Sequence, residues 1–599
     1  MYELDKPDNL VEMFENSVEK FAANKWLGTR NEEKNEYEWV TYKDTAIRID
    51  NMRSGFAQLG IGKHDTVSVI ANNCVEWAVA CFATYGLGAR FVPMYEAELA
   101  SIWEYIIKDS NAKVLLVSKP EIYQKVKDFQ KKIKGLDHVV MMYGKDETSM
   151  YQLEQMGRGK PVKSLYPDAD DIAGLIYTSG TTGDPKGVLL SHGNFTSNVH
   201  AAQKAYDVLD ENMRTLSFLP WAHSFGQTTE LNSLMHVGGS TGFAESSKTI
   251  PRDLQLVRPN FLVGVPRVFN KVYDGVKAKI NEKGGLARAL FNMGINAGVK
   301  RRELAGQGKS NALANLKLAL ADKIVFKKIR QGFGGQLQYA MSASAALNPR
   351  VVEFFFDIGI PIFEAWGMTE LSPAGSLSTP DDYKIGSVGK AIDKVKFAID
   401  KSFKSEDPRQ GELIVYGPNV MKGYHNKPKQ TSAAFTDDGG LRTGDFAYID
   451  DDGFLYITGR IKENFKLENG KFVYPAAIEE EIRLLPYVEQ AMIYGINQEY
   501  TICIVYPDFD VMEKYAKRQG LPCEPEQMLN HQKIKDFFEN KITKQLSSKF
   551  ASYEIPKKFI FSVQGVSVEN GLLTQTLKIK RREIVKRFAR QIEDAYKEN

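Results

Sequence analysis

The chain has 599 residues, more than one hydrophobic core usually organises, so two or more domains are expected. Its composition is 43% hydrophobic, 26% charged and 11% aromatic, which is typical of a soluble globular enzyme. The net charge of +3 is too small to favour nucleic-acid binding or a strongly basic membrane-binding surface. These figures predict a multidomain protein without a nucleic-acid partner.

Cysteine usage and the lack of long apolar runs favour a cytoplasmic protein. The four cysteines form no C-x-x-C pair and are too few for a disulfide scaffold, so reduced thiols are expected. The first ten residues lack the apolar core of a signal peptide. No run approaches the ~18 apolar residues of a membrane span. Any membrane contact is therefore expected to be peripheral.

Helical and strand patterns alternate along the first 120 residues. Apolar residues at helical spacing predict an opening helix over 10–21, with Asp8 or Asn9 as its N-cap. The elements expected next are strands at 39–42, 65–71, 91–94 and 113–117 and helices at 44–59, 75–86 and 98–109. This alternation predicts a parallel, doubly wound α/β domain, in which ligands bind beyond the carboxyl ends of the strands.

A loop rich in glycine and hydroxyl side chains follows the next apolar run, 173–176. It is the segment 177–187, with the sequence YTSGTTGDPKG. Glycines let backbone N–H groups approach phosphate oxygens, hydroxyls donate hydrogen bonds, and Lys186 supplies positive charge. Because Lys186 is followed by Gly187, the loop is not the G-x-x-x-x-G-K-[ST] loop of kinases and GTPases. A flexible surface turn is the alternative, but the flanking apolar runs favour a phosphate site.

The decamer TSGTTGDPKG resembles the signature of the adenylate-forming superfamily, which contains acyl-CoA synthetases, luciferases and peptide-synthetase adenylation domains. The resemblance runs in family order from about residue 8 to about residue 585. It implies that the loop holds the phosphates of ATP through Thr178, Ser179, Gly180, Thr181, Thr182, Gly183 and Lys186.

A second motif, LPWAHSFG at 219–226, resembles the acyl-pocket motif of this superfamily. The resemblance implies that His223 stands beside the substrate carboxylate. Without it, a lone histidine after a strand is more often structural. The segment 261–269 and a lysine- and alanine-rich helical stretch over 270–335 are similar to long-chain acyl-CoA synthetases. A solvated helical hairpin is the alternative for that stretch.

Two further segments resemble the adenine-binding part of the superfamily. The small residues at 340–347 include Ser344 and match a turn that is usually richer in glycine. The segment 362–370, IFEAWGMTE, implies nucleotide contacts by Glu364, Ala365, Trp366, Gly367 and Met368. Trp366 would stack on adenine, Thr369 would bond a phosphoryl oxygen, and Glu370 would hold Mg²⁺. The alternative is a capped helix start with a core tryptophan.

The remaining motifs lie toward the C-terminus. Residues 411–417 and 421–424 predict strands of a small β subdomain. By resemblance, Asp445 binds the ribose hydroxyls and Arg460 contacts ribose and phosphate. Lys462 would be the hinge, Gly470 would let the pantetheine arm of CoA pass, and Lys578 of the TQTLK segment would be the catalytic lysine. A surface arginine and a solvated charge run are the alternatives for Arg460 and for 578–582.

The expected fold is therefore α/β, with doubly wound parallel sheets and a small β subdomain in residues 1–461. A small, mobile α+β domain would follow in 462–599. The resemblance implies activation of a long-chain fatty acid by ATP and Mg²⁺, then transfer to CoA. A fatty-acyl-AMP ligase that loads a carrier protein, an aryl- or medium-chain acyl-CoA ligase and a non-catalytic binding protein remain the alternatives. No motif indicates an oligomeric state.

Overall fold

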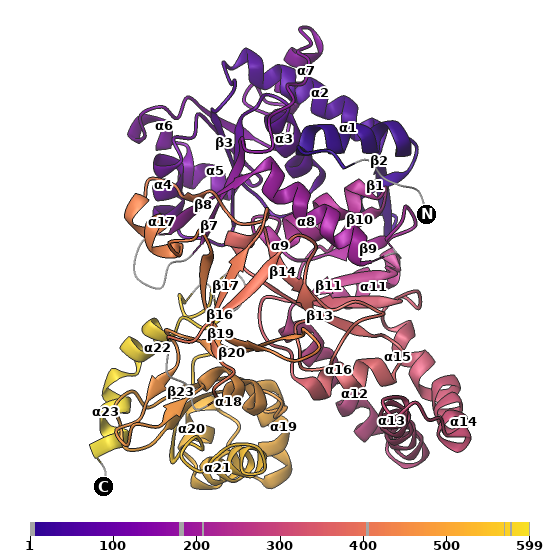
Figure 1. The fold of residues 1–599 in the computed structure, drawn as a ribbon, viewed down its shortest axis with the longest axis vertical. Helices are drawn as coiled ribbons and strands as arrows, with labels where there is room; N and C mark the ends of the chain where they lie inside the picture. Colours follow the sequence, from indigo (N-terminus) through magenta and orange to yellow (C-terminus); the bar gives the residue numbers. More distant parts are fainter. Residues whose placement is uncertain are drawn as a thin grey trace.

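The computed structural model describes residues 6–178, 185–206, 209–402, 407–567, 570–574 and 578–597, the side chain of Ala305 excepted. Figure 1 shows an elongated molecule. Three of its sheets and most of the helices form the upper and middle parts, and the C-terminal segment forms a separate lobe at the lower left. The four-stranded sheet β16-β17-β19-β20 lies between them.

The first large sheet has seven strands in the order β18-β8-β7-β4-β3-β5-β6. Their bounds are β3 (Thr66–Ile70), β4 (Arg90–Met94), β5 (Val114–Val117), β6 (His138–Met141), β7 (Ile172–Thr178), β8 (Lys186–Ser191) and β18 (Gly423–Tyr424). The pairs from β7 to β6 are parallel, whereas β7–β8 and β8–β18 are antiparallel. The predicted doubly wound α/β architecture is confirmed.

Strand β18 corrects one sequence prediction. Residues 421–424 were expected in the small β subdomain, but Gly423 pairs with Leu189 and Tyr424 with Val188. The strand therefore forms the edge of the seven-stranded sheet. Helix α8 (His192–Ala205) fixes this arrangement, because the amide of Asn194 donates to the carbonyls of Pro418 and Val420 at 2.8 and 3.0 Å.

A second sheet has five strands in the order β11-β12-β13-β14-β15, and a third has four in the order β2-β1-β10-β9. The second contains β11 (Phe261–Gly264), β12 (Tyr339–Ser342), β13 (Ile362–Gly367), β14 (Ala374–Leu377) and β15 (Lys390–Ala391). The third contains β1 (Lys25–Asn31), β2 (Glu36–Thr41), β9 (Arg214–Ser217) and β10 (Ser240–Phe243). Parallel pairing joins β11, β12 and β13, and likewise β1, β10 and β9.

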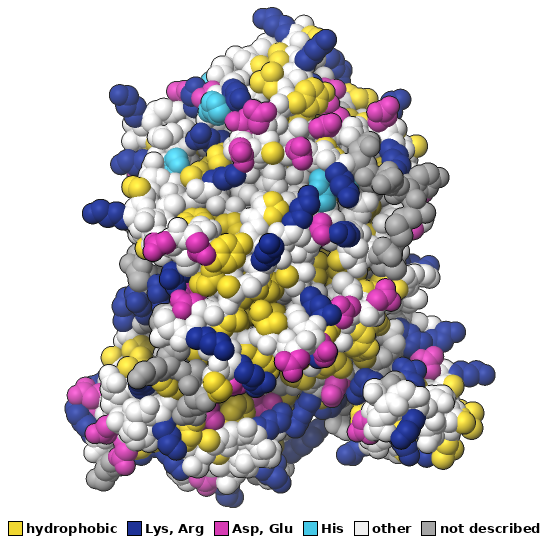
Figure 2. Space-filling view, in the orientation of Figure 1, with side chains coloured by type: hydrophobic (Ala, Val, Ile, Leu, Met, Phe, Trp, Pro, Cys, Tyr) yellow, Lys and Arg dark blue, Asp and Glu magenta, His cyan; other side chains and the backbone are white. Residues whose placement is uncertain are grey.

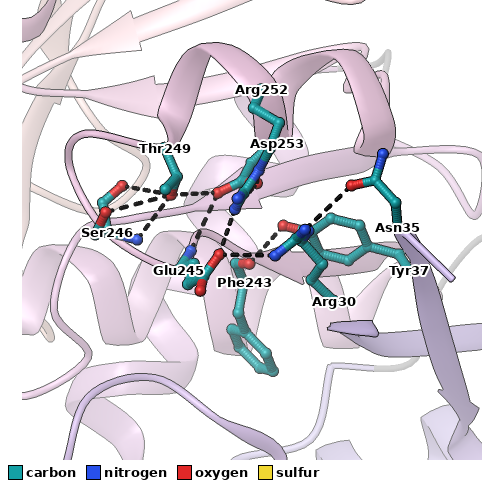
Figure 3. Close-up of polar contacts among 9 residues, drawn as sticks. All are labelled: Arg30, Asn35, Tyr37, Phe243, Glu245, Ser246, Thr249, Arg252 and Asp253. Carbon is teal, nitrogen blue, oxygen red and sulfur yellow. Dashed lines mark hydrogen bonds and ion pairs between the residues drawn. The ribbon is translucent and has the colours of Figure 1, made fainter. Parts of the chain in front are cut away.

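A polar network around the buried carboxylate of Asp253 ties the third sheet to helix α11 (Ile250–Val257) (Figure 3). Asp253 accepts hydrogen bonds from Thr249 Oγ1 at 2.7 Å and from the backbone N–H of Glu245 at 3.1 Å. Arg30 on β1 pairs with the carboxylate of Glu245 at 3.1 Å. Buried charge is tolerated here because every carboxylate oxygen of Asp253 has a donor, Arg252 included.

Helices cover the faces of these sheets. Helix α1 (Leu10–Phe21) begins as predicted, with Asn9 as the N-cap that accepts from the N–H of Glu12 at 2.9 Å. The other helices before residue 260 are α2 (Tyr42–Gln58), α3 (Val75–Tyr85), α4 (Ala100–Asp109), α5 (Pro120–Val126), α6 (Phe129–Lys132), α7 (Met150–Arg158), α9 (Ser224–Gly226) and α10 (Leu234–His236). The π-helix η1 (Gln227–Ser233) joins α9 to α10.

The stretch expected to be helical over 270–335 forms α12 (Pro266–Lys283), α13 (Gly285–Ala305), α14 (Ala312–Ala321), the π-helix η2 (Asp322–Phe326) and α15 (Lys327–Gln331). Helices α13 and α14 form a hairpin that projects at the lower right of Figure 1. An ion pair between Arg302, near the C-terminal end of α13, and Asp357 on α16 (Pro349–Asp357) holds the hairpin against the body. The apolar residues of these helices share one core with α16.

The small sheet contains β16 (Lys396–Asp400), β17 (Gly411–Tyr416), β19 (Leu441–Ile449) and β20 (Leu455–Arg460). Helix α17 (Pro428–Ala434) lies between β18 and β19 in sequence and contacts β18. The C-terminal lobe contains β21 (Phe465–Lys466), β22 (Phe472–Val473), α18 (Pro475–Ile482), β23 (Val488–Tyr494), β24 (Ile502–Pro507), α19 (Phe509–Gln519), α20 (Pro525–Asn530), α21 (Gln532–Leu546), β25 (Lys558–Phe561), α22 (Arg581–Arg587) and α23 (Ala589–Lys597). Its own hydrophobic clusters make it a separately packed α+β unit.

Candidate active site

The two ends of the glycine-rich loop lie on adjacent strands, β7 and β8, where Thr178 pairs with Lys186. Ser179, Gly180, Thr181, Thr182 and Gly183 lie outside the described residues. Lys186 places its ammonium 4.6 Å from the ring centre of Tyr424 on β18. The Tyr424 hydroxyl in turn donates to Glu370 Oε1 at 2.8 Å. The structure thus brings the loop lysine and the expected metal carboxylate to the same sheet edge.

Thr369 and Glu370 lie in the short helix η3 (Thr369–Leu371), which follows β13. Both side chains are buried, and the N–H of Met421 donates to the carbonyl of Glu370 at 2.9 Å. Ser224 Oγ lies 3.4 Å from Thr369 Oγ1. The motif at 219–226 therefore contacts the motif at 362–370, although 145 residues separate Ser224 from Thr369.

His223 caps α9 through Nδ1, which accepts from the N–H of Phe225 at 3.2 Å. That hydrogen bond assigns the proton of the neutral ring to Nε2. Burial, with the positive charge of Lys578 adding to it, lowers the pKa of His223 to about 4. The ring is therefore neutral at pH 7 and offers one N–H donor, which suits a carboxylate or acyl oxygen.

Asp445 lies at the centre of the expected ribose site. It is 2% exposed and is the first residue of β19 that pairs with β20, where it lies opposite Arg460. Arg460 Nε lies 2.7 Å from Asp445 Oδ1, and the indole N–H of Trp366 donates to Asp445 Oδ2 at 2.9 Å. Each oxygen keeps a lone pair for another donor, so the carboxylate is held in place while it remains able to accept two hydroxyls.

Gly367 lets Trp366 reach this position. A Cβ on Gly367 would lie 1.8 Å from the carbonyl oxygen of Pro373. The pairing of β13 with β14 is also irregular between Trp366 and Gly367. The glycine thus permits a close approach of two backbones beside the Trp366–Asp445 hydrogen bond.

Lys578 reaches the same cluster from the C-terminal lobe. Its carbonyl accepts from the N–H of Thr574 at 2.8 Å. Desolvation of its ammonium and the charge of Arg460 lower its pKa to about 8, against the opposing effect of Asp445 and Glu463.

The other residues expected to bind the nucleotide lie in the 340–347 turn and in or next to β13. Ser344 has a φ of +74°, a conformation that favours glycine, in agreement with the glycine-rich form of that turn in the superfamily. Glu364 is buried and accepts from the N–H of Leu347 at 3.4 Å, and its burial raises its pKa to about 8. Ala365 is buried in β13, and Met368 is half-buried beside η3.

Gly470 is not joined to the Asp445 cluster by any hydrogen bond or ion pair among the described residues. It lies in an exposed turn between β21 and β22 with a φ of +80°, and its N–H donates to the carbonyl of Leu467 at 2.9 Å. The turn explains the glycine in conformational terms. Its contact with a pantetheine arm stays a prediction.

Sequence reasoning missed Tyr424, which it assigned only to a strand. It also missed Glu230, which is fully buried on η1 and whose pKa is raised to about 8, mainly by desolvation. Ser217 donates to Glu230, and Asn73 donates to Ser217 at 2.8 Å and to the carbonyl of Leu219 at 2.7 Å. Through these contacts Glu230 supports the segment that carries His223. Nothing in its spacing marks it as buried.

Polar contacts join the C-terminal lobe to the rest of the molecule. Arg267 Nη2 at the start of α12 lies 2.7 Å from Glu489 Oε1 on β23, and both side chains are about a third exposed. Asn348 Nδ2 donates to Glu481 Oε2 on α18 at 3.1 Å. Polar contacts of this kind are typical of domains that move relative to one another.

Metal ligands are sparse in this region. Across the described ranges, no group of three or more His, Cys, Asp or Glu side chains is placed to hold a metal ion. Glu370 offers a single carboxylate beside the phosphate loop. That donor set fits Mg²⁺, which proteins often hold through one or two carboxylates together with substrate phosphates.

Known proteins resemble this chain over most of its length. The AMP-binding enzyme family matches residues 14–425, and the AMP-binding enzyme C-terminal domain matches residues 463–599. Fatty acyl-CoA synthetase A of Dictyostelium discoideum is 29% identical, over 97% of this chain and 90% of its own length. The long-chain-fatty-acid–CoA ligase FadD15 of Mycobacterium bovis is 30% identical, over 93% and 92%.

A solved structure shares the fold. The adenylation domain of a carboxylate reductase from Mycobacterium chelonae superimposes with a TM-score of 0.78 at 22% identity, covering 98% of this chain and 91% of that one. In the part of the chain that the structure describes, no helix combines the length and the apolar character needed to cross a bilayer.

Proposed function

We propose, because this chain belongs to the AMP-binding enzyme family, that it activates a long-chain fatty acid with ATP and then transfers the acyl group to CoA. The observation that carries the proposal is the ion pair of the buried Asp445 carboxylate with Arg460. The same carboxylate accepts from the indole N–H of Trp366, and the charge of Lys578 from the C-terminal lobe acts on this cluster. The relatives named as fatty acyl-CoA synthetases support the choice of a fatty acid.

In the first half-reaction a carboxylate oxygen of the fatty acid attacks the α-phosphorus of ATP. Pyrophosphate leaves, and the acyl group becomes a mixed anhydride with AMP. The reaction requires positioning and charge stabilisation more than a protein nucleophile. Lys186 and Lys578 would neutralise phosphate charge, and the Nε2–H of His223 would orient the carboxylate. Asp445 would fix the ribose through its two oxygens.

Glu370 would hold Mg²⁺ next to the phosphates, where the cation supplies charge neutralisation. Tyr424 orients the Glu370 carboxylate through its 2.8 Å hydrogen bond and separates it from the Lys186 ammonium. Trp366 would line the adenine site, together with Ser344, Glu364, Ala365, Gly367 and Met368. Its indole N–H also positions Asp445.

In the second half-reaction the thiolate of CoA attacks the carbonyl carbon of the acyl-adenylate, and AMP leaves. We assign residues 1–461 and 462–599 to two domains, with Lys462 as the hinge in the turn after β20. Rotation there would withdraw Lys578 and present the 463–471 turn, where Gly470 leaves room for the pantetheine arm. The polar contacts between the lobe and the body would permit that motion. The four free cysteines support a cytoplasmic location.

The experiment that tests the function is carboxylate-dependent ATP–pyrophosphate exchange over acids from acetate to oleate, followed by thioester analysis with CoA. Exchange with long acids and an acyl-CoA product are expected. Exchange without thioester would assign the chain to the fatty-acyl-AMP ligases. A preference for aryl or medium-chain acids would assign it to the aryl- or medium-chain acyl-CoA ligases. No exchange with any acid would overturn the proposal.

The two-step account has its own test. Lys578→Ala is expected to lower the rate of pyrophosphate exchange by about two to four orders of magnitude, because it removes a cation that stabilises the transition state. Supplied acyl-AMP should still yield acyl-CoA at close to the wild-type rate. Equal loss of both half-reactions would refute the withdrawal of Lys578.

A further inference from the structure

The projecting hairpin of α13 and α14 carries an exposed apolar stripe. Its members are Leu313, Leu316, Leu320 and Ile324, which are 60%, 69%, 47% and 40% exposed. Their spacing of three, four and four residues places all of them on one face of α14 and its continuation η2. The opposite face packs on α13 through Ala314, Leu318 and Ala321. None of the four side chains of the stripe belongs to the hydrophobic core that α13 and α14 share with α16.

Basic side chains surround the stripe. Residues 285–331 contain ten Lys and Arg but two Asp and Glu, a net charge of +8, whereas the whole chain has +3. The exposed lysines nearest the stripe in helical register are Lys317, Lys323, Lys327 and Lys328. In the described parts of the chain none of these four has an ion-pair partner within 4.0 Å. Figure 2 shows hydrophobic and basic side chains together on this projection.

We infer that the apolar stripe and its lysines form a docking surface for an anionic lipid bilayer. Interfacial helices insert an apolar face to the depth of the acyl–headgroup boundary while lysines extend to anionic headgroups. Helix α14, which carries most of the stripe, lies at the outer edge of the molecule (Figure 1), and the four side chains of the stripe are exposed. The inference depends only on this surface, so vesicle binding can fail while fatty-acid activation stands.

A second copy of the chain is the main competing occupant. Two such faces brought together would oppose two segments of net charge +8 without an intervening acidic surface. An anionic bilayer supplies the missing negative charge and the apolar medium at once. The low overall charge of the chain conceals this surface, because the rest of the molecule is net acidic.

The test is sedimentation of the full chain with vesicles of phosphatidylcholine alone or with about 30% phosphatidylglycerol. Binding to the anionic vesicles is expected, with at least tenfold weaker binding to the neutral ones and a marked loss at high salt. The double variant Leu316→Gln, Leu320→Gln should bind the anionic vesicles at least tenfold more weakly than wild type. Leu99→Gln, at a 64% exposed leucine on the N-cap of α4, is the matched control and should bind as wild type does.

Both changes lie on the surface, so the melting temperature and pyrophosphate exchange should match the wild type and thereby exclude a folding defect. Failure of the wild type to bind anionic vesicles would overturn the inference. So would unchanged binding by the double variant. Concentration-dependent dimerisation of the wild type that the double variant loses would also overturn it, because the stripe would then cover a second copy.

Discussion

The hydrogen bond from Trp366 to Asp445 provides a sharp test of the nucleotide site. Trp366→Phe keeps an aromatic ring in the position proposed to line the adenine, but removes the N–H that lies 2.9 Å from Asp445 Oδ2. Because Asp445 is 2% exposed, water replaces the lost donor poorly. The carboxylate would then be held on one side only, by Arg460.

The expected size follows from the chemistry of that bond. A hydrogen bond to a charged group contributes about 1.5–3 kcal/mol. At about 1.4 kcal/mol for each factor of ten, kcat/KM for ATP should fall about 10- to 150-fold. The assay is pyrophosphate exchange with ATP varied at saturating fatty acid. Binding of the fatty acid should change far less, because Asp445 faces the expected ribose site.

Trp26→Phe is the matched control, since Trp26 is a buried tryptophan on β1 whose indole N–H has no partner among the described residues. It should lose stability through packing without a selective effect on ATP. A fall in kcat/KM for ATP of less than about threefold in folded Trp366→Phe would refute the orienting role of the indole N–H. An equal fall in Trp26→Phe would attribute the loss to packing.

Three other outcomes are expected. Because the pKa of Lys578 is lowered to about 8, the ammonium of the free enzyme loses its proton as the pH rises through that value, so kcat/KM for ATP should fall on the alkaline side. Lys578→Arg should lack this alkaline decline, and an identical decline in the variant would exclude Lys578 as its source. Gly367→Ala places a Cβ 1.8 Å from a backbone oxygen and should cost about 3 kcal/mol in unfolding free energy. Gly62→Ala, which has open space around it, should be within about 0.5 kcal/mol of wild type, and similar denaturation midpoints for the two would contradict the clash. Asp253→Ala leaves its donors unpaired in a buried site and should cost about 3 kcal/mol, whereas Asp128→Ala, at an exposed pair, should be nearly neutral by thermal melting.

Local patterns predicted most of the large sheet because its strands are short, apolar and separated by amphipathic helices. Strand β18 was assigned to the wrong sheet for a physical reason. Two residues are too few for a periodicity, and its pairing with β8 is fixed by contacts more than 200 residues away in sequence. Tyr424 links Lys186 to Glu370 only because β18 pairs with β8, so this role could not be predicted from the sequence either.

The motifs named the residues of the site but not their mutual geometry. Asp445 and Trp366 are 79 residues apart, and only the fold brings the indole N–H to the carboxylate. Glu230 resembles any polar residue in a helix, and its burial results from the packing of η1 against α8 and other parts of the fold that are distant in sequence. The net charge of the chain gave no indication of the basic hairpin, because an average over all residues conceals where opposite charges are placed.

The partly exposed ion pair between Arg267 and Glu489 has a consequence for the rate of turnover. An exposed pair of this kind contributes about 0–1 kcal/mol, comparable to thermal energy, and dissolved salt weakens it further. The proposed rotation would have to break this ion pair in every catalytic cycle, and its weakness would make that step easy. Substitutions at these two positions would then change the rate of domain rotation and leave the specificity for the fatty acid unchanged. Natural selection could therefore adjust the turnover rate and the substrate specificity independently.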